Sequence, residues 1–147
     1  MSTENNKQLM KRFVEFINTA SEILSKELVA AEAKFFVPGQ AEPLYGPAGY
    51  LNIINMMRSG FSDIQWELEE MVAENDKIAA RFTMRGTHDG PFFGVPATYK
   101  AIEVTAINFY RFHNNQIIEE FGQPDLLNLL QQIGAIPINE LKTLSII

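Results

Sequence analysis

The sequence predicts an α+β fold in which helices cover one face of a curved antiparallel sheet. Two observations support this prediction. Apolar residues recur at three- and four-residue steps in the first part of the chain, which indicates helices. From residue 63 onward they alternate with polar residues, which indicates strands joined by turns. Helices, then a meander, then a closing helix is the order expected when helices pack on one side of a sheet.

The first 60 residues are predicted to form helices around one short strand. Apolar residues spaced for a single helix face run from residue 6 to about 29, so this segment is one helix, or two helices with a break near Asn18 and Thr19. The run at 35–39 is apolar and ends in Pro-Gly, as expected of an edge strand that enters a turn. A second helix is expected over 46–60, because Pro47 suits the first helical position.

Three segments after residue 63 have the alternation of strands with one buried face. The first covers 63–71, the second begins at Ile78 after a turn at 75–77, and the third covers 99–112. A loop rich in glycine and proline, 89–96, separates the last two. The residues expected to face inward are Ile64, Trp66 and Leu68 on the first strand, Ile78, Ala80, Phe82, Met84, Gly86 and His88 on the second, and Ile102, Val104, Ala106, Asn108, Tyr110 and Phe112 on the third.

A hairpin turn at 113–116 is predicted to lead into the last strand. Its two asparagines tolerate the positive φ that such turns need. If Phe112 pairs with Ile117, then Glu119 and Phe121 face inward together with the polar residues of the preceding strand. A register that differs by one residue would place both of them on the solvated face.

The segment after the last strand predicts a closing helix. Asp125 precedes a leucine-rich run, so we interpret it as the N-cap of this helix rather than as a catalytic acid. Gly134 suits the C-terminal stop. No internal repeat divides the chain, and we therefore expect one domain over 1–147, with a core at about 6–135 and an apolar C-terminal tail at 136–147.

Composition excludes several classes of function. The 147 residues include no cysteine and only two histidines, so a disulfide framework, a thiol nucleophile, a thiolate metal site and a multi-histidine centre are excluded, and we expect no metal and no cofactor. The net charge of -6 argues against a nucleic-acid partner. Neither a signal-peptide pattern nor an apolar run long enough to span a bilayer is present, so we expect no membrane association and a cytoplasmic protein.

The long strand at 99–112 has large apolar residues on both faces. Its outward set includes Ile107 and Phe109, although an antiparallel sheet with one solvated face should be polar there. Such residues should not stay in water, and the simplest partner is a second copy of the chain. We therefore expect a homodimer through this face.

Five segments in fixed order resemble one known family. They are AARFTMRGTH at 79–88, FGVPAT at 93–98, FYRF at 109–112, PD at 124–125 and LQQIG at 130–134. Together they resemble the SnoaL-like polyketide cyclase family of the nuclear-transport-factor-two-like superfamily, and the resemblance extends from the first helix to Gly134. It implies a cone-shaped sheet wrapped around helices, which holds a small apolar molecule and often pairs as a dimer through its outer face.

The resemblance also implies where the family's catalytic groups would stand. In the cyclases an aspartate just after the last strand is the acid and base of an intramolecular aldol closure, and the matching position here is Gly122. A slip of a residue or two would bring Glu120 or Gln123 to that position instead. The family's other polar positions match Ala106, Asn108 and Val37, of which only Asn108 can hydrogen-bond. Glycine cannot move a proton, so we expect no catalysis through the cyclase aspartate.

Two residues are candidates for a replacement acid or base. His88 lies on an otherwise apolar strand face, where a histidine can act as acid or base near neutral pH, but we favour the interpretation of a structural histidine bonded to the loop at 90–94. Glu119, if it faces inward, would be a base strengthened by burial, but it is equally a partner of Arg111 or Arg81, or a solvated residue.

The predicted pocket combines a few polar groups with apolar walls. Asn108 and Tyr110 would orient a ligand carbonyl or hydroxyl, or would satisfy each other; the walls are Trp66, Met57, Phe82 and Phe121. We predict a protein that binds a small apolar metabolite containing a carbonyl or a ring. The alternatives are a cofactor-independent cyclase or isomerase that uses Glu119 or His88, and a non-catalytic dimerisation module.

Overall fold

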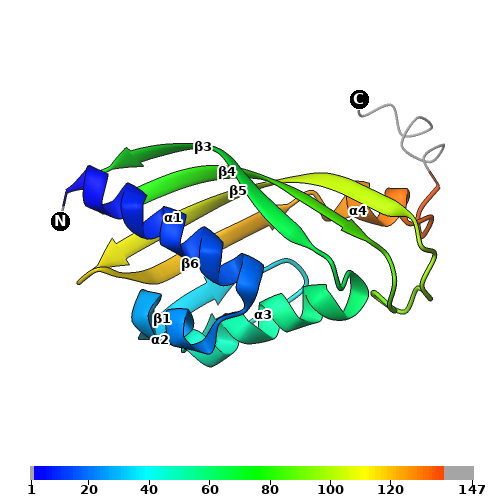
Figure 1. The fold of residues 1–147 in the computed structure, drawn as a ribbon, viewed down its shortest axis with the longest axis horizontal. Helices are drawn as coiled ribbons and strands as arrows, with labels where there is room; N and C mark the ends of the chain where they lie inside the picture. Colours follow the sequence, from blue (N-terminus) through cyan, green and yellow to red (C-terminus); the bar gives the residue numbers. More distant parts are fainter. Residues whose placement is uncertain (1, 138–147) are drawn as a thin grey trace.

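The computed structural model describes residues 2–137 of the chain. In these residues the predicted order of elements is confirmed, and Figure 1 shows the long strands arching over α1 while α3 runs along the lower edge of the molecule. The elements are α1 (Thr3–Thr19), α2 (Glu22–Leu28), β1 (Val29–Phe36), β2 (Leu44–Tyr45), α3 (Gly46–Gly60), β3 (Gln65–Glu74), β4 (Lys77–Thr87), β5 (Ala101–His113), β6 (Gln116–Pro124) and α4 (Leu126–Gln132).

The first helical segment was predicted to be one helix or two helices with a break, and the structure has two helices, α1 and α2. Ala20 adopts the left-handed conformation, with φ of 55°, and so ends α1. Ser21 then caps α2 by accepting a hydrogen bond from the backbone N–H of Leu24 at 3.1 Å. The predicted bounds of α3 are confirmed, with Pro47 near its start, and Asp125 caps α4 by accepting from the N–H of Asn128.

The sheet has the strand order β2-β1-β6-β5-β4-β3 and is antiparallel except where β1 runs parallel to β6. The prediction of an edge strand near residue 35 is wrong, because β1 lies between β2 and β6. The two-residue β2 takes the edge instead. The curved, unclosed sheet and its helices form the predicted α+β cone.

The hairpin between β5 and β6 contains a β-bulge that reverses one prediction. Phe112 pairs with Ile117 as expected, but Arg111 pairs with Glu119, which leaves Ile118 as an extra residue. Since side chains alternate along a strand, one extra residue inverts the faces of everything that follows. The inward orientation predicted for Glu119 and Phe121 is therefore wrong, and Glu120 and Gly122 face inward instead.

The core fills the space between the concave face of the sheet and the helices. Its centre is an aromatic cluster in which the Tyr50 ring lies 5.0 Å from Phe13 and 4.6 Å from Phe35, in edge-to-face arrangements. On the opposite face of the sheet, Ile107 and Phe109 are 57% and 44% exposed. None of the helices in residues 2–137 is long and apolar enough to cross a membrane. The predicted tail mostly lies outside the described residues.

Candidate functional site

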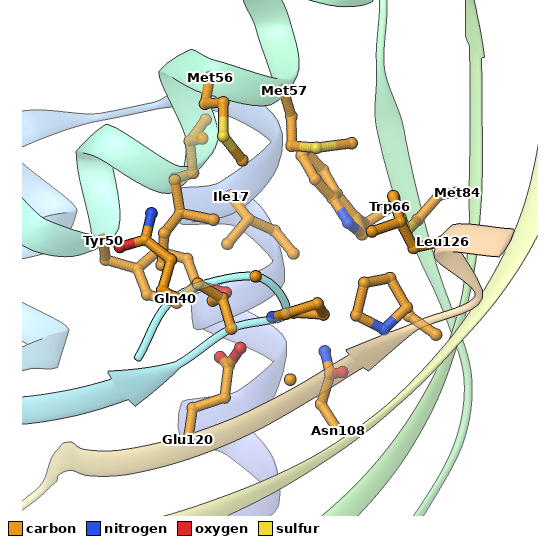
Figure 2. Close-up of a pocket in the computed structure, with 18 of the residues that line it drawn as sticks. Ile17, Gln40, Tyr50, Met56, Met57, Trp66, Met84, Asn108, Glu120 and Leu126 are labelled. Atoms are coloured by element: carbon orange, nitrogen blue, oxygen red, sulfur yellow. The ribbon is translucent and has the colours of Figure 1, made fainter. Parts of the chain in front are cut away.

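A cavity of about 180 Å³ lies between α3 and the inner face of the sheet. Figure 2 shows Glu120 and Asn108 pointing into it from the sheet, opposite Met56 and Met57 of α3. Most of its lining is apolar. The lining residues are Ile17, Val37, Pro38, Gly39, Gln40, Tyr50, Ile53, Ile54, Met56, Met57, Trp66, Met84, Phe92, Phe93, Ala106, Asn108, Glu120, Gly122, Pro124 and Leu126.

Glu120 is the single charged residue in this lining and the chemically distinctive group of the site. Only 4% of its surface is exposed, although carboxylates are seldom buried without a cationic partner. Burial raises the pKa of Glu120 to about 7, against the smaller, opposing effect of hydrogen bonds from Tyr50 and Tyr110. The side chain can therefore take up or release a proton near neutral pH.

Two tyrosine hydroxyls lie within hydrogen-bonding reach of the Glu120 carboxyl group. Tyr50 comes from α3, and Tyr110 is the direct neighbour of Glu120 on β5. Burial, and then the negative charge of Glu120, hold the pKa of both tyrosines well above the ordinary value. Both hydroxyls therefore keep their protons and remain donors. The Oε1 atom of Glu120 is buried and forms no hydrogen bond of normal geometry with the described residues.

Asn108 completes the polar end of the cavity. Its Oδ1 accepts a hydrogen bond from the backbone N–H of Gln123 at 3.0 Å, and this fixes the orientation of the amide. Its Nδ2 donates to the hydroxyl of Tyr110 at 3.1 Å. An amide nitrogen has two hydrogens, so one remains to bind the carbonyl oxygen of a ligand.

Gly122 leaves open the space that these groups share. A Cβ atom added there would lie 3.0 Å from Glu120 Oε2 and 3.8 Å from Asn108 Oδ1. The position that the family resemblance assigns to a catalytic aspartate therefore lies directly beside the Glu120 carboxyl group. Glu120 lies two residues before Gly122 on the same strand face, and its carboxyl group extends to the position where a side chain at residue 122 would begin.

Three predicted pocket residues, Asn108, Trp66 and Met57, lie in the cavity lining. Two others, Tyr110 and Phe82, face inward as predicted but are buried in the core and do not border the cavity. Tyr110 acts on the site through Glu120. The predicted mutual contact of Asn108 and Tyr110 is also present.

His88 is buried and lies outside the cavity lining. Its Nδ1 contacts the hydroxyl of Thr98 at 2.8 Å and the backbone N–H of the same residue at 3.2 Å. The ring also packs at 5.3 Å from Phe61. The histidine thus fastens the end of the loop before β5, at Thr98 rather than at residues 90–94, and the geometry favours the structural reading.

Glu119 and Phe121 lie on the outer face of the sheet, for the reason given by the bulge. Glu119 Oε1 is 3.5 Å from Arg111 Nε, which is the ion pair named as its alternative role. The Phe121 ring stacks on Phe36 at 4.6 Å and is partly exposed. Neither side chain lines the cavity.

The sequence reasoning missed Glu120 as an inward residue and Tyr50 altogether, although a signal existed for each. An inward Gly122 requires an inward Glu120, because residues two apart on a strand share a face. That parity excludes an inward Glu119, and it agrees with the pairing of Phe112 and Ile117 only if a bulge lies between Ile117 and Glu119. Tyr50 has the helical spacing of Ile54 and Met57, and all three are buried on the inner face of α3.

No lysine, arginine or histidine belongs to the cavity lining. Among residues 2–137 there is no group of three or more His, Cys, Asp or Glu side chains placed to hold a metal ion. What the described residues offer a ligand is a proton donor or acceptor, an amide and an apolar wall. This arrangement suits a neutral molecule with at least one carbonyl group.

Comparison with known proteins agrees with the fold. The model of the SnoaL-like polyketide cyclase family matches residues 7–133. Aklanonic acid methyl ester cyclase DnrD of Streptomyces peucetius is 28% identical over 139 residues, which cover 91% of this chain and 92% of DnrD. The structure of TsrD from Streptomyces laurentii superposes with a TM-score of 0.81 at 26% identity, covering 92% and 99% of the two chains. The structure of IdmH from Streptomyces antibioticus superposes with a TM-score of 0.78 at 27% identity, covering 87% of this chain and 97% of IdmH.

Proposed function

Because the chain belongs to the SnoaL-like polyketide cyclase family, we propose that its cavity binds a neutral, apolar carbonyl compound and that Glu120 catalyses ring closure within it. The buried Glu120 beside Gly122 is the observation on which the proposal rests. The proposal keeps the predicted binding function and moves the acid and base role away from Glu119 and His88.

The reaction needs only one group that exchanges a proton. Ionised Glu120 removes a proton from a carbon next to a carbonyl group, and the resulting enolate attacks a second carbonyl of the same molecule. A carbon–carbon bond forms, the second carbonyl becomes an alkoxide, and protonated Glu120 returns the proton to it. Substrate and product are isomers, so the step requires no oxidant, metal or co-reactant.

Three properties of the site support this role. A general base works best when its pKa is near the working pH, and burial raises the pKa of Glu120 to about 7. The free hydrogen on Asn108 Nδ2 is placed to stabilise negative charge on a carbonyl oxygen. Most of the cavity lining is apolar, and an apolar surrounding strengthens both interactions.

The test uses the compound named by the relative DnrD, aklanonic acid methyl ester, as the first probe. We expect the purified protein to convert it, or a neutral diketone ester of similar size, to a cyclised isomer that chromatography and mass spectrometry detect. Glu120→Gln should reduce turnover by about 10²–10⁴-fold while binding persists. The neighbouring Glu119→Gln is the matched control and should keep wild-type turnover. Equal turnover in both variants would refute the role of Glu120.

We also propose that the chain forms a homodimer through its outer apolar patch, defined as Ile107, Phe109 and Phe121. Phe109 and Phe121 are directly paired across β5 and β6, and all three are exposed. The nearby charges of Arg111 and Glu119 already face each other, which leaves the patch itself neutral. A two-fold interface brings the same patch from each copy together.

Light scattering at micromolar concentration should give twice the mass of one chain. Ile107→Glu should give the monomer mass, because two like charges would meet across the two-fold axis. A monomer for the unmodified protein would refute this assembly.

A further inference from the structure

Two buried hydroxyl groups that the proposed reaction does not itself use lie close to the polar end of the cavity. Tyr50 and Tyr110 come from different elements, α3 and β5, yet both hydroxyls interact with the same buried carboxyl group and with each other. Neither hydroxyl can ionise near neutral pH, because burial raises the pKa of both tyrosines well above the ordinary value. Each therefore stays a neutral hydroxyl, which can donate one hydrogen bond and accept others.

Aromatic packing holds both hydroxyls in place. The Phe13 ring contacts Tyr50 at 5.0 Å and Tyr110 at 5.6 Å, edge to face in both cases. Phe35 contacts Tyr50 from the other side at 4.6 Å. Because these rings are buried and close-packed, the two hydroxyls cannot swing away when Glu120 changes its protonation state.

The hydrogen of the Tyr110 hydroxyl also has a set direction. Asn108 Oδ1 must accept from the backbone N–H of Gln123, so Asn108 Nδ2 is the atom that faces Tyr110 and donates to its oxygen. A hydroxyl that receives this bond has its own hydrogen free for another acceptor. The Tyr110 hydroxyl also interacts with Tyr50, which lowers its pKa as a donor does, whereas Glu120 raises it as an acceptor does, so its acceptor is the Glu120 carboxyl group. A backbone N–H thereby determines the direction of donation along the whole chain of groups.

We propose that Tyr50 and Tyr110 are positioning residues that hold the Glu120 carboxyl group at the cavity wall and stabilise its ionised form. From β1 the residue paired with Glu120 is the apolar Phe35, and the two tyrosines are the only titratable groups among the described residues that act on Glu120. The proposal deepens the proposed function, but titration of Glu120 can be followed without substrate, so the two can fail separately.

The first experiment follows the unmodified protein by NMR, with carbon-13 at the Glu Cδ and Tyr Cζ positions. The Glu120 signal should titrate with a midpoint near pH 7. The Cζ signals of Tyr50 and Tyr110 should inflect at the same midpoint, although both tyrosines stay protonated, because the strength of their hydrogen bonds follows the Glu120 charge. Tyr45 and Tyr99 are exposed controls and should show no inflection there. Glu120→Gln should abolish the inflection at Tyr50 and Tyr110.

The second experiment removes one hydroxyl at a time. In Tyr50→Phe and in Tyr110→Phe the Glu120 midpoint should rise by about one pH unit, because the ionised carboxylate loses a donor while the neutral acid loses less. Tyr99→Phe should leave the midpoint unchanged. If Tyr110→Phe does not fold, Tyr50→Phe and the unmodified protein still decide the matter. Flat tyrosine signals across the Glu120 titration, or an unchanged midpoint in Tyr50→Phe, would overturn the proposal.

Measurements of turnover distinguish the positioning role of the two tyrosines from the proposed cyclisation reaction. If the probe ester is cyclised, the acidic limb of the kcat/KM profile should move to higher pH in Tyr50→Phe by the same shift as the NMR midpoint. Coupled titration without any turnover would leave the positioning role in place and remove the proposed reaction. Turnover that depends on Glu120, together with tyrosine signals that do not change with pH, would support the proposed reaction and refute the positioning role.

Discussion

Glu119 and Glu120 are neighbours with the same side chain, and the fold gives them opposite surroundings. Glu119 lies on the outer face of the sheet, where it meets solvent and the guanidinium group of Arg111. Glu120 lies on the inner face, beside two tyrosines and a largely apolar cavity whose lining includes no lysine, arginine or histidine. The two residues therefore allow a comparison in which only the environment differs.

The comparison shows that the protonation of a carboxyl group depends on what surrounds it. Outside, water and a nearby cation stabilise the charge, so the side chain contributes little beyond a surface ion pair. Inside, burial disfavours the charge and raises the pKa of Glu120 to about 7. A single extra residue, Ile118 in the β-bulge, decides which of the two glutamates is inside.

The variant with the largest expected effect adds a second carboxyl group to the inner face of the sheet. In Gly122→Asp the new side chain begins 3.0 Å from Glu120 Oε2, so two carboxylates would share one dry site. At pH 8 we expect a loss of about 3 kcal/mol or more in the free energy of unfolding, measured by denaturant titration. Gly122→Asn is the control of equal size, and it should cost much less because it crowds Glu120 in the same way but adds no second charge.

A double variant sharpens the same comparison. Glu120→Ala together with Gly122→Asp restores a single carboxyl group, now at the position that the family resemblance assigns to the aspartate. It should recover stability at pH 8 relative to Gly122→Asp alone, with a coupling energy of about 2 kcal/mol. Additive effects of the two changes would show that the side chains do not compete for one space.

The second prediction, smaller in size, concerns pH and stability. The pKa of Glu120 is about 7 in the folded protein and near the ordinary 4.5 when unfolded, so the folded state retains a proton that the unfolded state has lost between these values. The stability from the neutral buried acid is complete below pH 4.5, falls as pH rises to 7, and is constant above. The total loss is about 3 kcal/mol.

Glu120→Gln should remove this pH dependence, because the amide does not titrate. The free energy of unfolding of the variant minus that of the unmodified protein should increase from pH 4 to pH 8 and then level off. Glu119→Gln should keep the slope of the unmodified protein. A difference for Glu120→Gln that is independent of pH would contradict the burial of its charge.

Most of the fold can be predicted from local sequence patterns. Two features cannot: a strand pairing between distant segments and a β-bulge caused by a single residue. The strand faces of β4 and β5 follow from alternation, which is why Phe82 and Tyr110 are inward as predicted. The parallel pairing of β1 with β6 joins segments far apart in the sequence, and no local pattern reports it. The β-bulge at Ile118 leaves no composition signal, so register predicted from the turn alone failed beyond it.

The candidate site was predictable in its walls and not in its chemistry. Trp66 and Met57 follow from apolar periodicity, which reports burial whatever the function. The proposed acid and base role depends on which glutamate faces inward and on which hydroxyl groups lie near it. Both are set by the tertiary structure. Gly122 was the most informative residue, because its missing side chain and its parity together point to Glu120.

The smallest predicted effect lies on the outer face and sets the baseline for the others. Arg111 Nε is 3.5 Å from Glu119 Oε1, and a second nitrogen of Arg111 is 3.6 Å from Asp76, with all three side chains partly exposed. Exposed pairs of this kind contribute about 0–1 kcal/mol, and Asp76 remains when Glu119 is neutralised. Glu119→Gln should therefore change the free energy of unfolding by less than about 0.5 kcal/mol at pH 7, and added salt should shrink even that difference, as denaturant titration at two ionic strengths can measure. A loss as large as that of Gly122→Asp would mean that the outer pair supports the fold and that the contrast between the two glutamates is not one of environment alone.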